Sequence, residues 1–453
     1  MVHAFSHSSD GVDNFFLWDI ESGSLHLVDY AAFLCAKKHY TLFMNAQEEF
    51  DFSVINESNV AEIEEELLEL ESNGTLNAPP AITQFSKNIS VVKALCLHIS
   101  HDCNMRCGYC FAGGGSYNTS RIHMSEDVGI AAVDFLIHNA GSRKNLEIDF
   151  FGGEPLLNFD VVKSIVEYAK KAGAKSNKVF SFTLTTNCVA LDQDVAEYLN
   201  AEMSNVILSI DGRKCIHDGV RHPLNSNITY DYIISNALNF RKLRKEKDYF
   251  VRGTFTAKNI DFLKDIETLH DLGFDAISIE PVVLNEQHPL AIKEEHIEAI
   301  FEEYTKLSKY YLKKQEESEG FSFFHFNIDL SGGPCVNKRL TGCGAGTEYL
   351  AVSPEGELYP CHQFVGKHDY KMGSVFDGLV DSEKKRLFSE LTVLSKEHCN
   401  ACPAKYHCGG GCSANSLNLA GNLWGQYKIG CALAQKRFEL SLALTFLKKQ
   451  IKS

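Results

Sequence analysis

The segment HDCNMRCGYCFAGGG, residues 101–115, places three cysteines on one short, glycine-rich stretch of chain. These are Cys103, Cys107 and Cys110, and three thiolates are one too few for an ordinary closed metal site. The Cys-x3-Cys-x2-Cys spacing suits a cubane iron–sulfur cluster that keeps one iron without a protein ligand. On spacing alone, the alternative is a zinc site that recruits a distant fourth cysteine.

Around this segment, short β-rich runs alternate with helical patterns such as residues 126–140 and 159–172. The alternation predicts an α/β fold of parallel βαβ units in a closed or partly closed barrel, with a long amphipathic helix at residues 294–317 leading out of it. The three-cysteine segment follows the first run, at the barrel end where function is expected. The six predicted strands are residues 91–100, 146–155, 179–187, 206–212, 249–259 and 274–283.

Motifs at the ends of these predicted strands make residues 91–320 resemble the radical S-adenosylmethionine (SAM) enzymes. Besides the three cysteines, with Tyr109 before the last of them, they are GGEP at 152–155, TTN at 185–187, SIDG at 209–212 and IEPV at 279–282. The resemblance implies a partial (β/α)6 TIM barrel and a 4Fe-4S cluster whose open iron chelates the amino and carboxylate groups of SAM. A zinc site would require none of these motifs.

The same resemblance implies the division of labour at the site. Paired glycines let backbone approach a ligand closely, and polar groups at strand ends can bind a zwitterionic ligand with a ribose. The cofactor supplies the radical chemistry, in which one electron cleaves SAM to methionine and a hydrogen-abstracting 5'-deoxyadenosyl radical. The residues expected to contact SAM are Tyr109, Gly152, Gly153, Glu154, Asn187, Ser209, Asp211, Arg221 and Arg252.

Residues 330–453 are rich in cysteine and resemble the SPASM domain, which carries two auxiliary 4Fe-4S clusters, so that three clusters are expected in all. By that resemblance, Cys335 is either the fourth ligand of one auxiliary cluster, or that iron stays open and deprotonates a substrate cysteine. A pair of zinc sites is the alternative, because CxxC pairs also suit zinc. The expected ligands are Cys399, Cys402, Cys408 and Cys431 for one cluster and Cys343, Cys361 and Cys412 for the other.

Residues 1–85 form a first predicted unit. Residues 15–30 alternate apolar and polar positions around ESGS, which predicts a β-hairpin, and residues 60–74 predict an amphipathic helix. Two strands followed by a helix suit the winged-helix-like element of ribosomal peptide maturases, where a leader peptide adds as an extra strand to a sheet edge. A stabilising cap without a ligand is the alternative.

Three segments make nearly the whole chain resemble the SCIFF maturases, which install thioether bridges in a short cysteine-rich peptide. They are residues 1–30, 338–366 and 399–412. The resemblance implies hydrogen abstraction from an acceptor residue, which we expect to be threonine, and attack on that carbon by a cysteine sulfur. The leftover electron would pass to an auxiliary cluster. Expected partners are a leader-bearing, cysteine-rich precursor peptide and an electron donor such as flavodoxin or ferredoxin.

Two other interpretations stay open. An anaerobic sulfatase-maturing enzyme, which oxidises cysteine or serine to formylglycine, would share the barrel and the cysteine array, but it has no reason to carry residues 1–85. A non-catalytic electron carrier or metal-stabilised peptide-binding scaffold would belong to a different class. Such a protein would not need GGEP or the other strand-end motifs.

The composition limits the cellular compartment and the classes of partner that we expect for this protein. The formal charge of −15 argues against a nucleic-acid binder, which would need basic patches. No run of 18 apolar residues suggests a membrane span, and the first residues lack the pattern of a secretory signal, so a cytoplasmic location is expected. Fifteen cysteines in a reducing compartment favour metal binding or redox chemistry over disulfides.

Overall fold

The computed structural model describes residues 1–9, 11–40, 57–86, 91–225, 228–330 and 335–452. Within them, six parallel strands lie side by side in chain order, which confirms the predicted α/β fold with a partial parallel barrel. Four of these strands fall within a predicted run, and β6 and β8 each begin one residue before theirs. The strands are β4 (Ala94–Ser100), β6 (Asn145–Gly152), β7 (Val179–Thr186), β8 (Asn205–Ser209), β10 (Tyr249–Phe255) and β11 (Ala276–Pro281).

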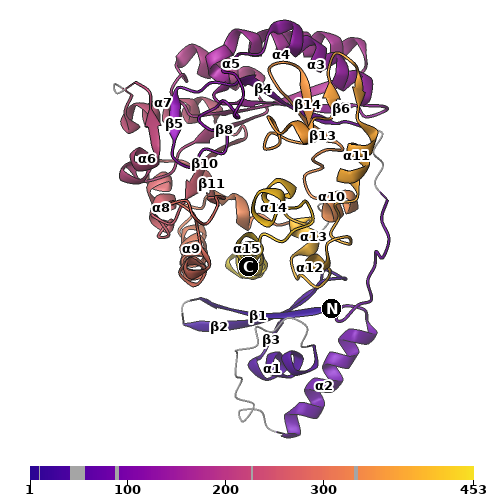
Figure 1. Cartoon of the computed structure of the whole chain (residues 1–453). Helices are drawn as coiled ribbons and strands as arrows, with labels where there is room; N and C mark the ends of the chain where they lie inside the picture. The colour runs from indigo at the N-terminus through magenta and orange to yellow at the C-terminus, as the bar shows by residue number, and fades with distance from the viewer. Residues whose placement is uncertain (10, 41–56, 87–90, 226–227, 331–334, 453) are drawn as a thin grey trace.

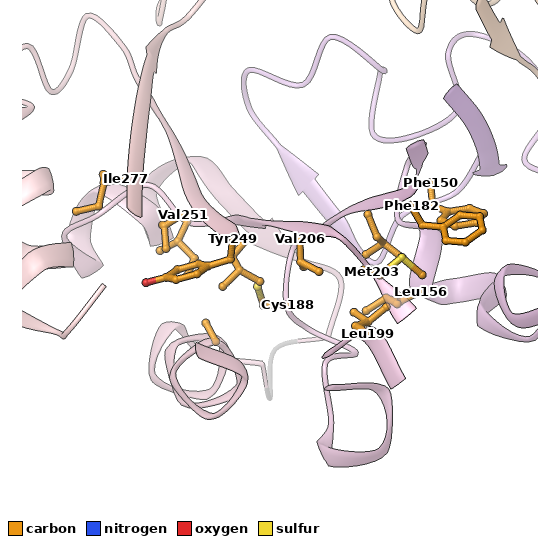
Figure 2. Packing of buried hydrophobic residues seen from close by; sticks show 14 of the residues in the cluster. Phe150, Leu156, Phe182, Cys188, Leu199, Met203, Val206, Tyr249, Val251 and Ile277 are labelled. Atoms are coloured by element: carbon orange, nitrogen blue, oxygen red, sulfur yellow. The ribbon is translucent and has the colours of Figure 1, made fainter. Parts of the chain in front are cut away.

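Helices cover the outer face of this sheet. β4 is buried along its whole length, whereas β6, β7, β8 and β10 alternate buried residues with less buried ones. Figure 2 shows part of the resulting core, where Phe150 of β6 and Phe182 of β7 stack with ring centroids 6.0 Å apart. Side-chain caps at Ser125, Asp192 and Thr229 start three of the helices. The helices are α3 (Glu126–Asn139), α4 (Phe159–Lys175), α5 (Gln193–Glu202), α6 (Lys214–Val220), α7 (Tyr230–Arg244), α8 (Leu263–Asp271) and α9 (Ile297–Glu316).

The C-terminal segment continues the same sheet instead of standing apart from it. Strand β13 (Tyr349–Val352) pairs in parallel with β4, from Tyr349 opposite Ala94 to Val352 opposite Leu97. The sheet then runs on through β14 (Glu357–Tyr359), β15 (Gly373–Ser374) and β16 (Leu379–Val380), and β12 (Ser322–Phe323) pairs with β11 at the other end. The cysteine-rich segment is thereby fixed directly beside the first barrel strand.

Short helices and one long helix complete the C-terminal segment. The long helix α15 packs against α9, and it lies between the barrel and the N-terminal strands (Figure 1). None of the helices in the described residues is both long enough and apolar enough to span a membrane. The helices are α10 (Val336–Thr341), α11 (Ser382–Ser389), α12 (Glu397–Asn400), α13 (Lys405–Cys408), α14 (Ser413–Ala420) and α15 (Lys428–Lys452).

The N-terminal unit differs from the predicted two strands and one helix. It has a three-stranded antiparallel sheet and, among the described residues, two helices; residues 41–56 lie outside the described part. The predicted hairpin is present, and the one predicted helix corresponds to the second helix of the structure. The first strand and the first helix of the structure were not predicted. The elements are β1 (Val2–Ser9), β2 (Val12–Asp19), β3 (Leu25–Val28), α1 (Tyr30–His39) and α2 (Glu57–Ser72).

This N-terminal sheet is packed on both faces. One face meets α1 and α2 through Leu17, Phe33 and Ile63. The other meets the C-terminal segment, where Trp18 lies edge-on to Phe438 of α15, with ring centroids 5.6 Å apart. Figure 1 shows β1 and β2 between α15 on one side and α1 on the other. The unit is therefore an integral part of the fold.

Candidate functional site

A cavity of about 600 Å³ opens at the carboxyl ends of the parallel strands. One wall is the three-cysteine segment, with Cys103, Cys107 and Cys110. Another wall comes from the C-terminal segment and includes Cys408, Cys412 and Cys431. The fold therefore brings the two cysteine-rich parts of the chain, about 300 residues apart in sequence, to one enclosed space.

The glycine pair of GGEP lets the three-cysteine segment lie directly on the end of β6. The backbone N–H of Gly153 donates to the Ser100 carbonyl at 2.7 Å, and that of Glu154 donates to the Asp102 carbonyl at 2.9 Å. A Cβ at Gly153 would meet the Asp102 oxygen at 2.1 Å, and Gly152 adopts a φ of +124°. Both glycines also line the cavity. They therefore pack closely on the cysteine segment, in addition to the close approach to a ligand that the sequence analysis expects of them.

The three thiols of this segment are held in a largely apolar environment. Burial raises the pKa of Cys103 to about 12, with a further contribution from the Glu154 charge, and burial raises the pKa of Cys107 to about 11. Thiolates there require a compensating cation. In the described residues, no three side chains of His, Cys, Asp or Glu lie close enough together to hold one metal ion. The donor set itself, three thiols facing one cavity, fits a cluster with an open iron.

Arg221 lies beside this segment because a small two-stranded ladder, β5 (Met105–Cys107) with β9 (Arg221–Pro223), pairs it with Cys107. Its guanidinium is held by Asp211, which also accepts hydrogen bonds from the Tyr109 hydroxyl at 2.6 Å and from the Thr254 backbone N–H at 2.9 Å. The Asp211 side chain is fully buried and engaged by these protein groups. Arg221 and Tyr109 line the cavity, and Asp211 supports both from behind.

Glu154 is buried at the junction of β6 and β7. It accepts hydrogen bonds from the Thr186 hydroxyl at 2.9 Å and from the backbone N–H groups of Asn187 and Leu156, at 2.8 Å and 3.2 Å. Burial outweighs these bonds and raises the pKa of Glu154 to about 7. The Asn187 amide in turn donates to Asn104 at 2.7 Å. Ser209 and Arg252, the remaining expected contacts, also line the cavity.

In the C-terminal segment, cysteines that the sequence assigns to the same set raise one another's pKa values. Burial raises the pKa of Cys399 to about 12 and of Cys431 to about 11, and Cys402 and Cys408 raise both pKa values further. In the second set, burial raises the pKa of Cys361, and the thiolates of Cys412 and Cys343 raise it further. Each set therefore shares one neighbourhood. Cys335 is exposed and lies at the start of α10.

The cavity also contains charged residues that the sequence analysis did not assign. Glu280 at the end of β11 pairs with His325 at 3.0 Å and with Arg437 of α15 at 3.6 Å. Burial alone would raise its pKa, but His325, Arg437 and Arg252 hold the pKa of Glu280 well below its usual range. Glu280 lies within the IEPV motif and could have been noticed there, whereas Arg437 sits in an ordinary helical pattern without a signal.

Comparison with known proteins finds similarity over the barrel segment and beyond it. Residues 97–255 match the model of the radical SAM superfamily. The chain is 24% identical over 336 residues to a cysteine-type anaerobic sulfatase-maturating enzyme of Clostridium novyi, covering 70% of this chain and 86% of that protein.

Two solved structures share the fold at low sequence identity. Native anSMEcpe with bound AdoMet and Cp18Cys peptide superposes with a TM-score of 0.65 at 19% identity, covering 80% of this chain and 99% of that one. Streptococcus suis SuiB bound to the precursor peptide SuiA superposes with a TM-score of 0.55 at 15% identity, covering 92% of this chain and 96% of that one.

Proposed function

Since residues 97–255 belong to the radical SAM superfamily and maturases are among the relatives of the chain, we propose that this protein is a radical SAM enzyme that forms thioether bridges in a ribosomally made, cysteine-rich peptide. One observation carries the proposal. A single cavity joins the three-cysteine segment to the C-terminal cysteine array, so that a peptide between them faces both.

The cysteines on the two walls of the cavity indicate which cofactors the protein would bind. SAM and a 4Fe-4S cluster would be held at Cys103, Cys107 and Cys110, and when bound they supply the hydrogen-abstracting radical. Two auxiliary 4Fe-4S clusters would be held by the C-terminal cysteines. Arg221, Asn187 and Ser209 line the cavity with groups that can bind a zwitterion and a ribose.

The proposed reaction balances as an oxidation of the peptide. A hydrogen atom leaves the acceptor carbon, which we propose to be on a threonine, and a proton leaves the cysteine thiol. The sulfur then bonds to that carbon, and the one electron left over passes to an auxiliary cluster. Each bridge removes two hydrogen atoms from the peptide.

Residues 1–85 would recognise the leader of that peptide. Among the described residues, β3 pairs only with β2 in the three-stranded sheet, so within that part of the chain its other edge has no strand partner, and Leu27 on β3 is 42% exposed. The superposition with SuiB, which was solved with its precursor peptide, covers more of this chain than that with anSMEcpe does. The wider coverage supports a peptide-recognition role for residues 1–85, which a sulfatase-maturing enzyme has no reason to carry.

Formylglycine formation is the second candidate, and the Clostridium novyi relative favours it as strongly as the other comparisons favour thioether formation. The two products differ in one functional group, because formylglycine carries an aldehyde and a thioether does not. Anaerobic reaction of the reconstituted enzyme with a leader-bearing cysteine-rich peptide and, separately, with a sulfatase-derived cysteine peptide decides between them. Hydrazide-reactive product from the second peptide alone would replace the thioether proposal. The absence of SAM cleavage with either would favour the non-catalytic class.

A further inference from the structure

A buried lysine ties together two parts of the C-terminal cysteine array. Lys396 is 3% exposed and precedes α12, where its carbonyl accepts a hydrogen bond from the Cys399 backbone N–H at 2.9 Å. Its ammonium donates to the carbonyl of Gly410 at 2.7 Å, between Cys408 and Cys412. One residue therefore links the Cys399 segment to the Cys408–Cys412 segment, through its backbone carbonyl and its side-chain ammonium.

Because Gly410 lies two residues from Cys408 and two from Cys412, this bond places the ammonium beside a segment that carries one cysteine of each set. Burial lowers the pKa of Lys396, and the thiolates of Cys399, Cys408, Cys412 and Cys431 each oppose that effect. A second buried lysine shows that this surrounding is specific. Lys385 of α11 is 7% exposed, and its pKa is lowered by burial without a thiolate contribution. A buried ammonium without a partner is strongly unfavourable, so Lys396 is placed to meet negative charge.

We propose that Lys396 is a positioning residue that holds a fixed positive charge between the two auxiliary clusters and raises their reduction potentials. The proposal rests on the proposed function, which assigns these cysteines to clusters. Net charge and hydrogen bonding around an iron–sulfur cluster set its potential, and a nearby cation stabilises the reduced, more negative state. The electron released when the C–S bond forms is thereby accepted by an oxidised auxiliary cluster, which is reduced by one electron.

Three substitutions separate the charge from the hydrogen bond. Lys396→Arg keeps both, Lys396→Gln keeps a donor without the charge, and Lys396→Met removes both. Lys385→Met removes a buried ammonium away from the cysteine array and is the matched control. Iron content and redox titrations followed by electron paramagnetic resonance are measured on the reconstituted enzyme, without peptide or turnover.

We expect Lys396→Gln, at full iron content, to shift the auxiliary midpoint potentials to more negative values, and Lys396→Arg and Lys385→Met to leave them at the wild-type values. Loss of iron in Lys396→Met with retention in Lys396→Gln also supports the proposal, because it shows the link to Gly410. Equal midpoint potentials in wild type and iron-replete Lys396→Gln would overturn the proposed role of Lys396 and leave the proposed function untouched. Zinc in place of iron in the wild-type array would overturn the cluster assignment instead.

Discussion

Arg221 and Asp211 form a buried two-point ion pair, from Nε to Oδ2 at 2.9 Å and from Nη2 to Oδ1 at 3.0 Å. Because Arg221 is paired with Cys107 across β5 and β9, this carboxylate fixes one side of the three-cysteine segment from the end of β8. The ion pair thus connects the barrel to the proposed cluster site.

Asp211→Ala leaves the Arg221 guanidinium buried without its partner. We expect a loss of about 3–5 kcal/mol in the free energy of unfolding, the cost of breaking a buried pair. Anaerobic denaturant titration measures it. The matched control is Asp231→Ala, which breaks the exposed pair with Lys214 and should cost about 1 kcal/mol or less. Equal effects of the two substitutions would refute the structural role of Asp211.

Gly153→Ala tests the packing of the cysteine segment on β6. The added Cβ would meet the Asp102 carbonyl oxygen at 2.1 Å, so either the segment or the strand end must move. We expect Gly153→Ala to lose the iron proposed for Cys103, Cys107 and Cys110 and to keep the iron proposed for the C-terminal cysteines. Iron content per chain measures the loss. Gly219→Ala, where a Cβ meets nothing within 4 Å, should retain full iron.

The raised pKa of Glu154 predicts a pH dependence of stability. Its pKa is 4.5 in the unfolded chain and about 7 in the folded protein, so the folded state binds more protons between these values. Stability should therefore fall as pH rises from 4.5 to 7, by up to about 3 kcal/mol from this residue. Thermal unfolding of Glu154→Gln across this range should show a shallower decline than wild type. Parallel curves for the two proteins would contradict the assignment.

The barrel could be predicted from sequence because short β-rich runs, such as residues 146–155 and 179–187, alternate with helical patterns, such as residues 159–172. Strand β1 could not, since VHAFSHSS carries two histidines and three serines and lacks strict alternation. The pairing of β13 with β4 joins residues about 250 positions apart, which local patterns do not encode.

At the site, motif spacing predicts the cysteine sets, but it does not predict the contacts that lie behind them. Asp211 was expected to reach the cofactor, whereas its carboxylate is engaged by Arg221, Tyr109 and Thr254 in the structure. Glu280 and Arg437 meet only through tertiary packing of α15 on the barrel. Such networks depend on three-dimensional geometry, which spacing along the chain does not contain.

A substitution at Glu21 tests whether the stability of the N-terminal unit depends on its contact with the C-terminal segment. Its carboxylate accepts from the buried Lys405 ammonium at 2.5 Å and from the Tyr406 hydroxyl at 2.8 Å. Glu21→Ala leaves the buried Lys405 ammonium without its carboxylate and with the Asn400 carbonyl at 3.3 Å. We expect a loss of about 3–5 kcal/mol in the free energy of unfolding, together with faster limited proteolysis between residues 1 and 86. Glu64→Ala breaks the exposed pair with His39 and serves as control. Unchanged proteolysis of Glu21→Ala would show that the contact is dispensable.

The most direct measurement is the mass of a leader-bearing, cysteine-rich precursor peptide after anaerobic incubation with reconstituted enzyme, SAM and reductant. The thioether account predicts SAM cleavage, loss of two hydrogen atoms per bridge, and cysteines that resist alkylation under reducing conditions. No SAM cleavage by enzyme with its full complement of iron, or cleavage with an unmodified peptide, would contradict it.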